Sequence, residues 1–362
     1  MTIATTLSTP VKPVDGPAAW RGDVLEKSGD WLFHLTPEQV GDLERLGVKF
    51  VEDDPDLRFA TAADYPVPFL ADAIASWGRD VDAGRGFVLV RGLRPHLYSD
   101  ALSAAIFFIL GLHMGDPMRQ NEMGDLLDHI YATSDKTMDD PTALPSKVRD
   151  QLVFHSDSSD VVALMCLRPG ESGGASLLVS GAQIYNEIVK RRPDLAPILQ
   201  EPFYWDWVKQ DPEAPANTYT SPMVSLVDGV FSMYAGATYI FTAQDYPETP
   251  RLTPQQIEVV KLFDEITYEP GMAIATSFQP GDIQWLSNYA ALHSRNAFTD
   301  YPEPQRRRHL LRLWLKRDVG RPIVPGFGKN SVVQDRSTQR AGQADTRGNF
   351  HIGVAAVPRL IA

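Results

Sequence analysis

The sequence predicts a mainly β protein of the sandwich or barrel type, with a small number of helices. Short strand-like segments follow one another at regular spacing between residues 151 and 316. Many short strands separated by turn residues are typical of sandwiches and barrels. Two helical segments interrupt this run, whereas a βα fold would alternate strands and helices throughout.

The first third of the chain is expected to mix helices, loops and one buried strand. Residues 1–20 are rich in Thr, Pro and Ala and are expected to form an arm, and residues 20–85 are expected to mix helix and loop. Thr36 followed by Pro37 predicts the start of a short helix over 37–46.

Two further segments precede the run of strands. Residues 86–92 begin and end with glycine and are apolar enough to form a strand buried on both faces. Ser99 or Asp100 is expected to cap a helix that runs to Leu112, with one apolar face packed into the core.

The rest of the chain supplies most of the predicted strands. Ser180 is expected to cap one helix through about residue 191, and Thr253 opens another with a Thr-x-x-Gln capping box. After Asp318, Gly, Pro, Gln and Arg predominate, so a loosely packed tail is expected. The predicted strands are near 129–133 and at 151–155, 161–168, 175–179, 201–205, 222–227, 230–235, 272–278, 282–286, 289–293 and 308–316.

Composition excludes several functional classes. The 362 residues carry a formal net charge of -12, which argues against nucleic acid or an anionic membrane surface as a partner. No signal peptide is visible, and no run reaches the roughly 20 apolar residues that a membrane helix needs. The single cysteine, Cys166, allows no internal disulfide and is expected in the core, so a cytoplasmic location is predicted.

The segment His155-Ser156-Asp157 is the first candidate for chemistry. Side chains two residues apart point to the same side of a strand, so the imidazole and the carboxylate can converge on one metal ion. The pair alone is a weak signal, because such spacing also arises by chance. A second histidine would complete a two-His-one-carboxylate set that holds Fe(II) and leaves one face open.

Two later segments supply candidates for the missing parts. Pro280-Gly281-Asp282 predicts a turn before a strand, and His293 follows in the segment Leu292-His293-Ser294-Arg295. On a strand at 308–316, Arg308 and Arg312 share one face. A buried guanidinium needs an anionic partner, which is either an internal Asp or Glu or the carboxylate of a small molecule.

Jointly these motifs carry a resemblance to a known family. The chain resembles the taurine dioxygenase (TauD/TfdA-like) family of Fe(II)/2-oxoglutarate-dependent dioxygenases over residues 84–317. The resemblance implies a double-stranded β-helix (jelly-roll, cupin-like) core with helices on its outside. The motifs, in family order, are His155-Ser156-Asp157, Gly173-Gly174-Ala175-Ser176, Pro280-Gly281-Asp282, Leu292-His293-Ser294-Arg295, and Arg308 with Arg312.

The resemblance also implies roles for single residues. His155, Asp157 and His293 correspond to the iron ligands. Arg308 corresponds to the arginine that pairs with the C5 carboxylate of 2-oxoglutarate. The family's second arginine corresponds to Arg312, which is expected to touch the cosubstrate or an anionic substrate group. Ser176 stands where the family often has Thr, and its hydroxyl is expected to donate to a cosubstrate carboxylate.

Around these residues, other polar side chains are candidates for supporting roles. Gln120, Asn121 and Asp125 are expected to form a turn or to orient a polar substrate. Asn288 and Arg295 flank His293 and are expected to fix the orientation of its ring.

The predicted organisation is one catalytic domain at 84–317, an N-terminal extension at 1–83 packed on it, and a C-terminal extension at 318–362. The implied cofactors are Fe(II), 2-oxoglutarate and O2, with release of succinate and CO2. The substrate is expected to be small and polar, with an anionic or amino-acid-like group, and a homo-oligomer is compatible with the sequence. The retained Asp157 favours hydroxylation, desaturation or cyclisation over halogenation, which would need an open coordination position for halide.

A function of another class remains open at this point. A non-oxidative cupin-like metalloprotein, either a hydrolase/isomerase or a ligand-binding sensor, would bind Zn or Mn at the same three residues and need no keto acid. Arg308 and Arg312 on one buried face speak against it, since such a protein has no standing need for a carboxylate clamp.

Overall fold

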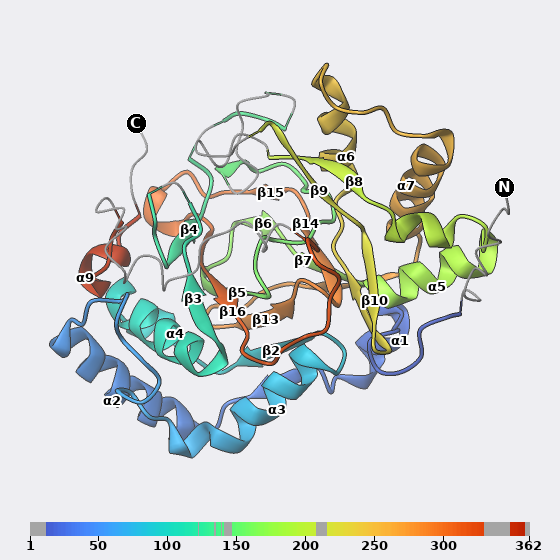
Figure 1. Cartoon of the computed structure of the whole chain (residues 1–362). Helices are drawn as coiled ribbons and strands as arrows, with labels where there is room; N and C mark the ends of the chain where they lie inside the picture. The colour runs from blue at the N-terminus through green and yellow to red at the C-terminus, as the bar shows by residue number, and fades with distance from the viewer. Residues whose placement is uncertain are drawn as a thin grey trace, which may run out of the picture.

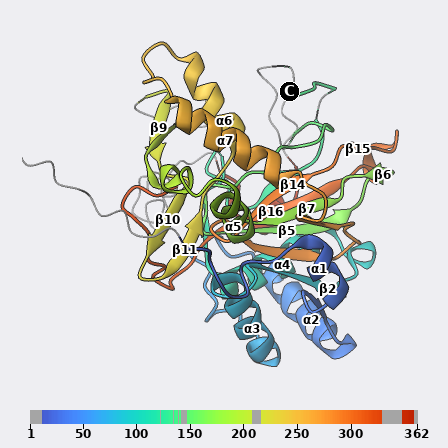
Figure 2. The same ribbon diagram turned by 90° about the vertical axis from the view of Figure 1, so that its right-hand side faces the viewer.

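Two facing β-sheets with helices on the outside make up the architecture (Figures 1 and 2). The structure is a computed structural model that describes residues 12–121, 123–133, 135–138, 140, 147–207, 216–328 and 348–358. The predicted mainly β fold with a cupin-like double-stranded β-helix core is confirmed. Figure 2 shows the sheets edge-on, with α1 to α4 on one side and α6 and α7 on the other.

The larger sheet has seven strands. Its order is β1-β2-β13-β5-β16-β3, and β4 pairs with another part of β16. All contacts are antiparallel except the parallel pair of β1 with β2. The strands are β1 (Leu32–His34), β2 (Phe87–Arg91), β3 (Asp116–Met118), β4 (Asp128–Ile130), β5 (Val161–Arg168), β13 (Ile283–Ser287) and β16 (His309–Lys316).

The smaller sheet faces the larger one. Its order is β12-β7-β14, where β12 is Ala273–Thr276, β7 is Ser176–Ser180 and β14 is Ala291–Arg295. Three further two-stranded sheets are separate from these: β6 (Ser172–Gly173) with β15 (Phe298–Thr299), β8 (Phe203–Asp206) with β9 (Thr218–Ser221), and β10 (Val224–Val227) with β11 (Val230–Met233).

The helices cover the outer faces of both sheets. Their bounds are α1 (Gly22–Ser28), α2 (Pro37–Asp53), α3 (Ala71–Asp82), α4 (Asp100–Met114), α5 (Gly181–Arg191), α6 (Ala237–Thr242), α7 (Pro254–Thr267) and α9 (Ile352–Ala355). The predicted caps at Thr36, Ser99, Ser180 and Thr253 all form, each accepting a bond from a backbone N–H.

Two predicted elements differ from the structure for clear physical reasons. The helix expected over 37–46 continues to Asp53, because Phe50 extends its buried stripe. The strand expected at 151–155 does not form. His155 alone makes an isolated bridge there, to His293.

The helix α4 is buried on nearly all sides rather than on one face. Phe107, Ile109 and Leu110 are each fully buried. α4 lies between α2 and the larger sheet, where it shares one apolar cluster with Trp285 and Leu313. An all-round apolar helix is expected to occupy such a central position.

Both ends of the chain contribute to this same cluster. Phe50, Trp77 and Val81 come from the N-terminal helices, and Phe350 and Ile352 come from the C-terminal segment. The expected loose packing of the tail is therefore wrong for these described residues. The division of the chain near residues 84 and 318 stays a prediction.

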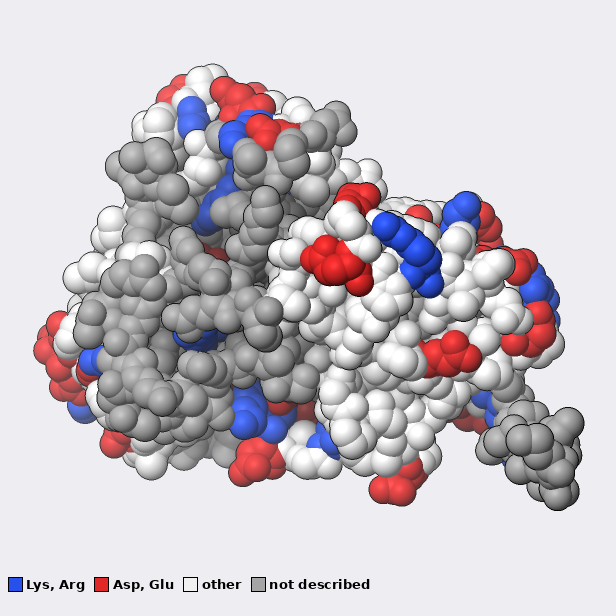
Figure 3. Space-filling model, turned by 45° about the horizontal axis from the view of Figure 1, so that its top comes forward, with Lys and Arg blue, Asp and Glu red and all other residues white. Residues whose placement is uncertain are grey.

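No helix among the described residues is long and apolar enough to cross a membrane. On the face seen in Figure 3, basic side chains are scattered and interspersed with acidic ones.

The turn before β13 is held by an ion pair whose carboxylate is buried and whose guanidinium is partly exposed. Gly281 has φ 89°, and a Cβ there would stand 2.2 Å from the carbonyl oxygen of Leu93, so only glycine fits. Asp282 is fully buried and accepts two bonds from Arg91, at 2.8 and 2.7 Å. This fork ties β2 to the start of β13.

We expect Asp282→Ala to lower the free energy of unfolding by about 3 kcal/mol, because it leaves the Arg91 guanidinium without its partner. Urea denaturation would measure the change. The matched control is Glu303→Gln, which breaks an exposed pair with Arg306 and should cost less than about 1 kcal/mol. Equal effects of the two substitutions would contradict this account.

Candidate metal centre

Three predicted ligand residues meet inside the fold. One donor atom each from His155, Asp157 and His293 lies within 4.8 Å of the others. The Nε2 atoms of His155 and His293 lie 3.7 and 3.8 Å from the two oxygens of Asp157, and the imidazole centroids are 4.3 Å apart. An ion bonded at about 2 Å to each donor fits between them.

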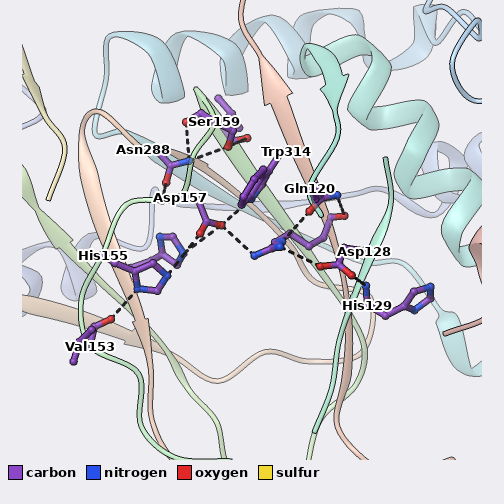
Figure 4. A network of polar contacts seen from close by, with 12 residues as sticks. Gln120, Asp128, His129, Val153, His155, Asp157, Ser159, Asn288 and Trp314 are labelled. Atoms are coloured by element: carbon purple, nitrogen blue, oxygen red, sulfur yellow. Dashed lines mark hydrogen bonds and ion pairs between the residues drawn. The ribbon is translucent and has the colours of Figure 1, made fainter. Parts of the chain in front are cut away.

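Backbone hydrogen bonds bring the ligands together. His155 and His293 exchange two N–H···O bonds of 3.0 Å, so the segment that carries His155 lies against β14. The backbone N–H of Asp157 donates to Asn288 Oδ1 at 2.9 Å, and the Asn288 amide donates to Ser159 (Figure 4). Asn288 therefore holds Asp157, and not the ring of His293 as expected.

Hydrogen bonding orients the ring of His155. Its Nδ1 lies 2.8 Å from the carbonyl oxygen of Val153, so this nitrogen carries the proton (Figure 4). The Nε2 lone pair is then available to a metal ion. His293 also presents Nε2 to Asp157, while its Nδ1 has no partner among the described residues.

The site carries a negative charge that suits a cation. Burial would raise the pKa of the Asp157 carboxyl, but Arg312, the two histidines and the Trp314 N–H together lower it to about 2. Burial lowers the pKa of His293 to about 3. At neutral pH a carboxylate and a neutral imidazole therefore face each other, as metal binding requires.

Trp314 supports the carboxylate directly. Its indole N–H donates to Asp157 Oδ2 at 2.9 Å, and Arg312 Nη1 lies 3.5 Å from the same oxygen (Figure 4). Oδ1, the oxygen nearer His155, then remains for a metal ion. Trp314 lies two residues after Arg312, so both side chains are expected on one face of the strand. The sequence did not indicate the contact between Trp314 and Asp157.

Arg312 has internal partners. Its Nε donates to Gln120 Oε1 at 2.8 Å, and its Nη2 lies 3.1 Å from Asp128 Oδ2 (Figure 4). Gln120 in turn donates to the backbone carbonyl of Arg312 at 2.9 Å. Asn121 and Asp125 bond to each other within a turn. Of the three polar residues in this segment, only Gln120 reaches the site.

Arg308 differs from Arg312 because no acidic side chain pairs with its guanidinium among the described residues. It is 5% exposed, and its Nη1 has no hydrogen-bond partner there. The guanidinium lies 5.0 Å from the ring centroid of Phe298, and a Cβ at Gly174 would stand 3.0 Å from its Nε. Burial lowers its pKa to about 10, so it remains a cation at neutral pH.

Ser176 and Arg295 lie opposite each other on β7 and β14. The Ser176 hydroxyl donates to Gln284 Oε1 at 3.0 Å. The guanidinium of Arg295 lies 4.6 Å from the Phe298 centroid and donates to the carbonyl of Asp150. Arg295 thus packs beside Arg308 against one ring, and no bond joins it to the His293 imidazole.

These observations fit both groups that the motifs imply. Two imidazoles and one carboxylate on one side of an ion suit Fe(II) and leave its other positions open. A buried arginine with a spare donor suits the carboxylate of a small molecule.

We expect Trp314→Phe to weaken binding of Fe(II) or Co(II) about 10-fold or more, since lost supporting bonds to a ligand typically cost 10- to 100-fold in affinity. Anaerobic metal titration followed by absorbance would measure it. Trp77→Phe is the matched control, because Trp77 is also buried but lies in α3. Unchanged affinity in Trp314→Phe would refute the supporting role.

Known proteins resemble this chain over most of its length. The model of the family "Taurine catabolism dioxygenase TauD, TfdA family" matches residues 54–314. FR-33289 synthase of Streptomyces rubellomurinus (strain ATCC 31215) is 25% identical over 316 residues, which cover 86% of this chain and 92% of the relative. The taurine hydroxylase-like protein SAT17 of Stachybotrys chartarum (strain CBS 109288 / IBT 7711) is 25% identical over 322 residues, or 86% of this chain and 82% of the relative.

Solved structures share the fold. Asparagine oxygenase in complex with Fe(II), 2S,3S-3-hydroxyasparagine and succinate has a TM-score of 0.61 and 16% identity, covering 79% of this chain and 93% of that one. Non-heme iron oxygenase OrfP in complex with Fe, succinate and (3S)-hydroxy-L-Arg has a TM-score of 0.60 and 14% identity, covering 82% and 98%. The family match spans the smaller sheet, most of the larger sheet and all three candidate ligands, and the chain therefore belongs to the TauD/TfdA family of Fe(II)- and 2-oxoglutarate-dependent dioxygenases.

Proposed function

We propose that His155, Asp157 and His293 hold Fe(II) and that Arg308 anchors the cosubstrate 2-oxoglutarate in the hydroxylation of an amino-acid-like small molecule. Ser176 supports the cosubstrate site indirectly, because its one hydroxyl proton is donated to Gln284. One observation carries this proposal. A three-residue metal cluster lies inside the fold together with a buried arginine, Arg308, that forms no ion pair with a described acidic side chain. His293 and Arg295 share one face of β14, and Arg295 and Arg308 pack on the same ring of Phe298. The family membership supports the reaction class.

The chain's own residues would bind and orient the reactants. When bound, Fe(II) with 2-oxoglutarate and O2 supplies the power to oxidise an unactivated C–H bond, with release of succinate and CO2. The Arg308 cation would neutralise the far carboxylate of the keto acid and direct its other end toward the ion. Phe87, Val162 and Trp314 fill one interior end with apolar contacts, which would limit water there.

For the substrate, the polar groups beside the ligands favour a zwitterion. Arg312 and Asp128 present opposite charges 3.1 Å apart next to Asp157. An α-amino acid carries both charges and could exchange partners with such a pair. The solved relatives carry 3-hydroxyasparagine and (3S)-hydroxy-L-Arg, which supports an amino-acid-like substrate. The earlier expectation that Arg312 touches the cosubstrate or substrate stays a prediction.

The non-oxidative metalloprotein draws no support from the family match. Such a protein would also bind no keto acid, so no ligand carboxylate would pair with the buried Arg308 cation. A cytoplasmic location and a homo-oligomer remain predictions from the sequence.

We expect the anaerobic protein with Fe(II) and 2-oxoglutarate to develop a visible charge-transfer band. Arg308→Ala should weaken 2-oxoglutarate binding at least about 30-fold, since truncating one partner of a buried charge pair costs about 2–5 kcal/mol. Arg307→Ala is the matched control, because Arg307 only donates to backbone carbonyls at the adjacent turn and should leave the affinity unchanged.

Absence of the band in the wild-type protein would refute the proposal. With the band present, succinate release would then be measured against a panel of amino acids. Coupling to none of them would refute the substrate class alone.

A further inference from the structure

Gln284 is a polar residue at the centre of the larger sheet. It is neither a candidate metal ligand nor a predicted partner of the cosubstrate carboxylate. It lies on β13 between β2 and β5, opposite Leu89 and Leu164. Its side chain faces the smaller sheet, because it bonds to Ser176 of β7. Gln284 is 2% exposed, so water does not satisfy its amide.

Only half of the Gln284 amide has a partner. Its Oε1 accepts the Ser176 hydroxyl at 3.0 Å. Its Nε2 is buried and has no hydrogen-bond partner among the described residues. A buried amide nitrogen without an acceptor costs free energy, so such a group in a native protein needs an explanation.

Unpaired donors outnumber unpaired acceptors around Arg308. Arg308 Nη1 and Arg295 Nε have no hydrogen-bond partner among the described residues. Asp300 takes the backbone N–H of Arg308 on Oδ1, and its Oδ2 lies 3.5 Å from Arg149.

Gly174 lies two residues before Ser176, and a Cβ at Gly174 would stand 3.0 Å from the Nε of Arg308, so the Arg308 guanidinium lies close to the start of β7. The nearby Asp282 carboxylate is already bonded twice to Arg91.

Several unpaired donors around one interior volume require an acceptor with several lone pairs. A carboxylate offers about four acceptor positions and can take an arginine and an amide together. A neutral ligand would leave the Arg308 cation buried without a counter-charge.

We propose that Gln284 is a cosubstrate-binding residue whose Nε2 donates to the distal carboxylate of 2-oxoglutarate beside Arg308. Ser176 holds the amide by its oxygen and so turns the NH₂ group toward the carboxylate. The inference rests on the proposed function. It adds a specificity element, since an amide at this place favours 2-oxo acids with a second carboxylate over those without one.

The test measures affinity for two keto acids of equal length. The anaerobic Fe(II) protein is titrated with 2-oxoglutarate and with 2-oxopentanoate, which lacks the distal carboxylate, and the charge-transfer band is followed. Gln284→Leu should weaken the binding of 2-oxoglutarate about 10-fold, which is the usual effect of losing a hydrogen bond to a charged group. The affinity for 2-oxopentanoate should stay unchanged. Gln284→Glu places a second carboxylate beside that of the ligand, so charge repulsion should weaken the binding of 2-oxoglutarate about 100-fold or more.

Trp285→Phe is the matched control on the same strand. Its indole nitrogen is also buried without a partner among the described residues, but its ring packs outward against Phe107 of α4. This variant should bind both acids as the wild type does. Thermal unfolding of each variant would show that it is folded.

A Gln284→Leu protein that binds 2-oxoglutarate within twofold of the wild type would overturn the inference. So would an equal loss for both keto acids, which would make Gln284 a brace between the sheets. A wild-type protein without any band would instead refute the proposed function, and this inference with it.

Discussion

The backbone bridge between His155 and His293 is the contact on which the metal centre depends. Two reciprocal hydrogen bonds of 3.0 Å attach the segment 154–157 to the edge of β14. They hold His155 directly against His293, and the Leu152 N–H adds a bond to the carbonyl of Arg295 on the same strand. Asn288 secures the other end of the segment through the backbone of Asp157. The ligands are thus positioned by main-chain pairing, which tolerates little displacement.

The interior of the fold is unusual in its balance of charge. One end is apolar, with Phe87, Val162 and Leu286 in a single cluster. The other end buries Arg308 and Arg295 near the same ring of Phe298, and neither guanidinium forms an ion pair with a described acidic side chain. Buried cations of this kind lower the stability of the empty protein. They are consistent with an interior built to receive an anion.

Much of the fold could be predicted because strand periodicity and helix caps are local signals. The strand at 161–168 and the helices that begin after Ser99, Ser180 and Thr253 start where their residues indicate. The segment 151–155 failed for a tertiary reason. The carbonyl of Val153 bonds to the His155 imidazole, and the segment bonds to the backbone of β14 at Leu152 and His155 without forming a continuous strand. Nothing in the local pattern distinguishes this segment from a strand.

The sequence by itself determined the identity of the candidate ligands and the need of Arg308 for an anion, because residue type and motif order carry that chemistry. Only the tertiary structure decided which arginine finds an internal partner. Arg312 meets Gln120 from 192 residues away, Trp314 reaches Asp157 across 157, and Ser176 meets Gln284 across 108. Such pairings arise when two sheets face each other, so no local pattern encodes them. These pairings show that Arg312 forms an internal ion pair, whereas Arg308 forms none with a described acidic side chain.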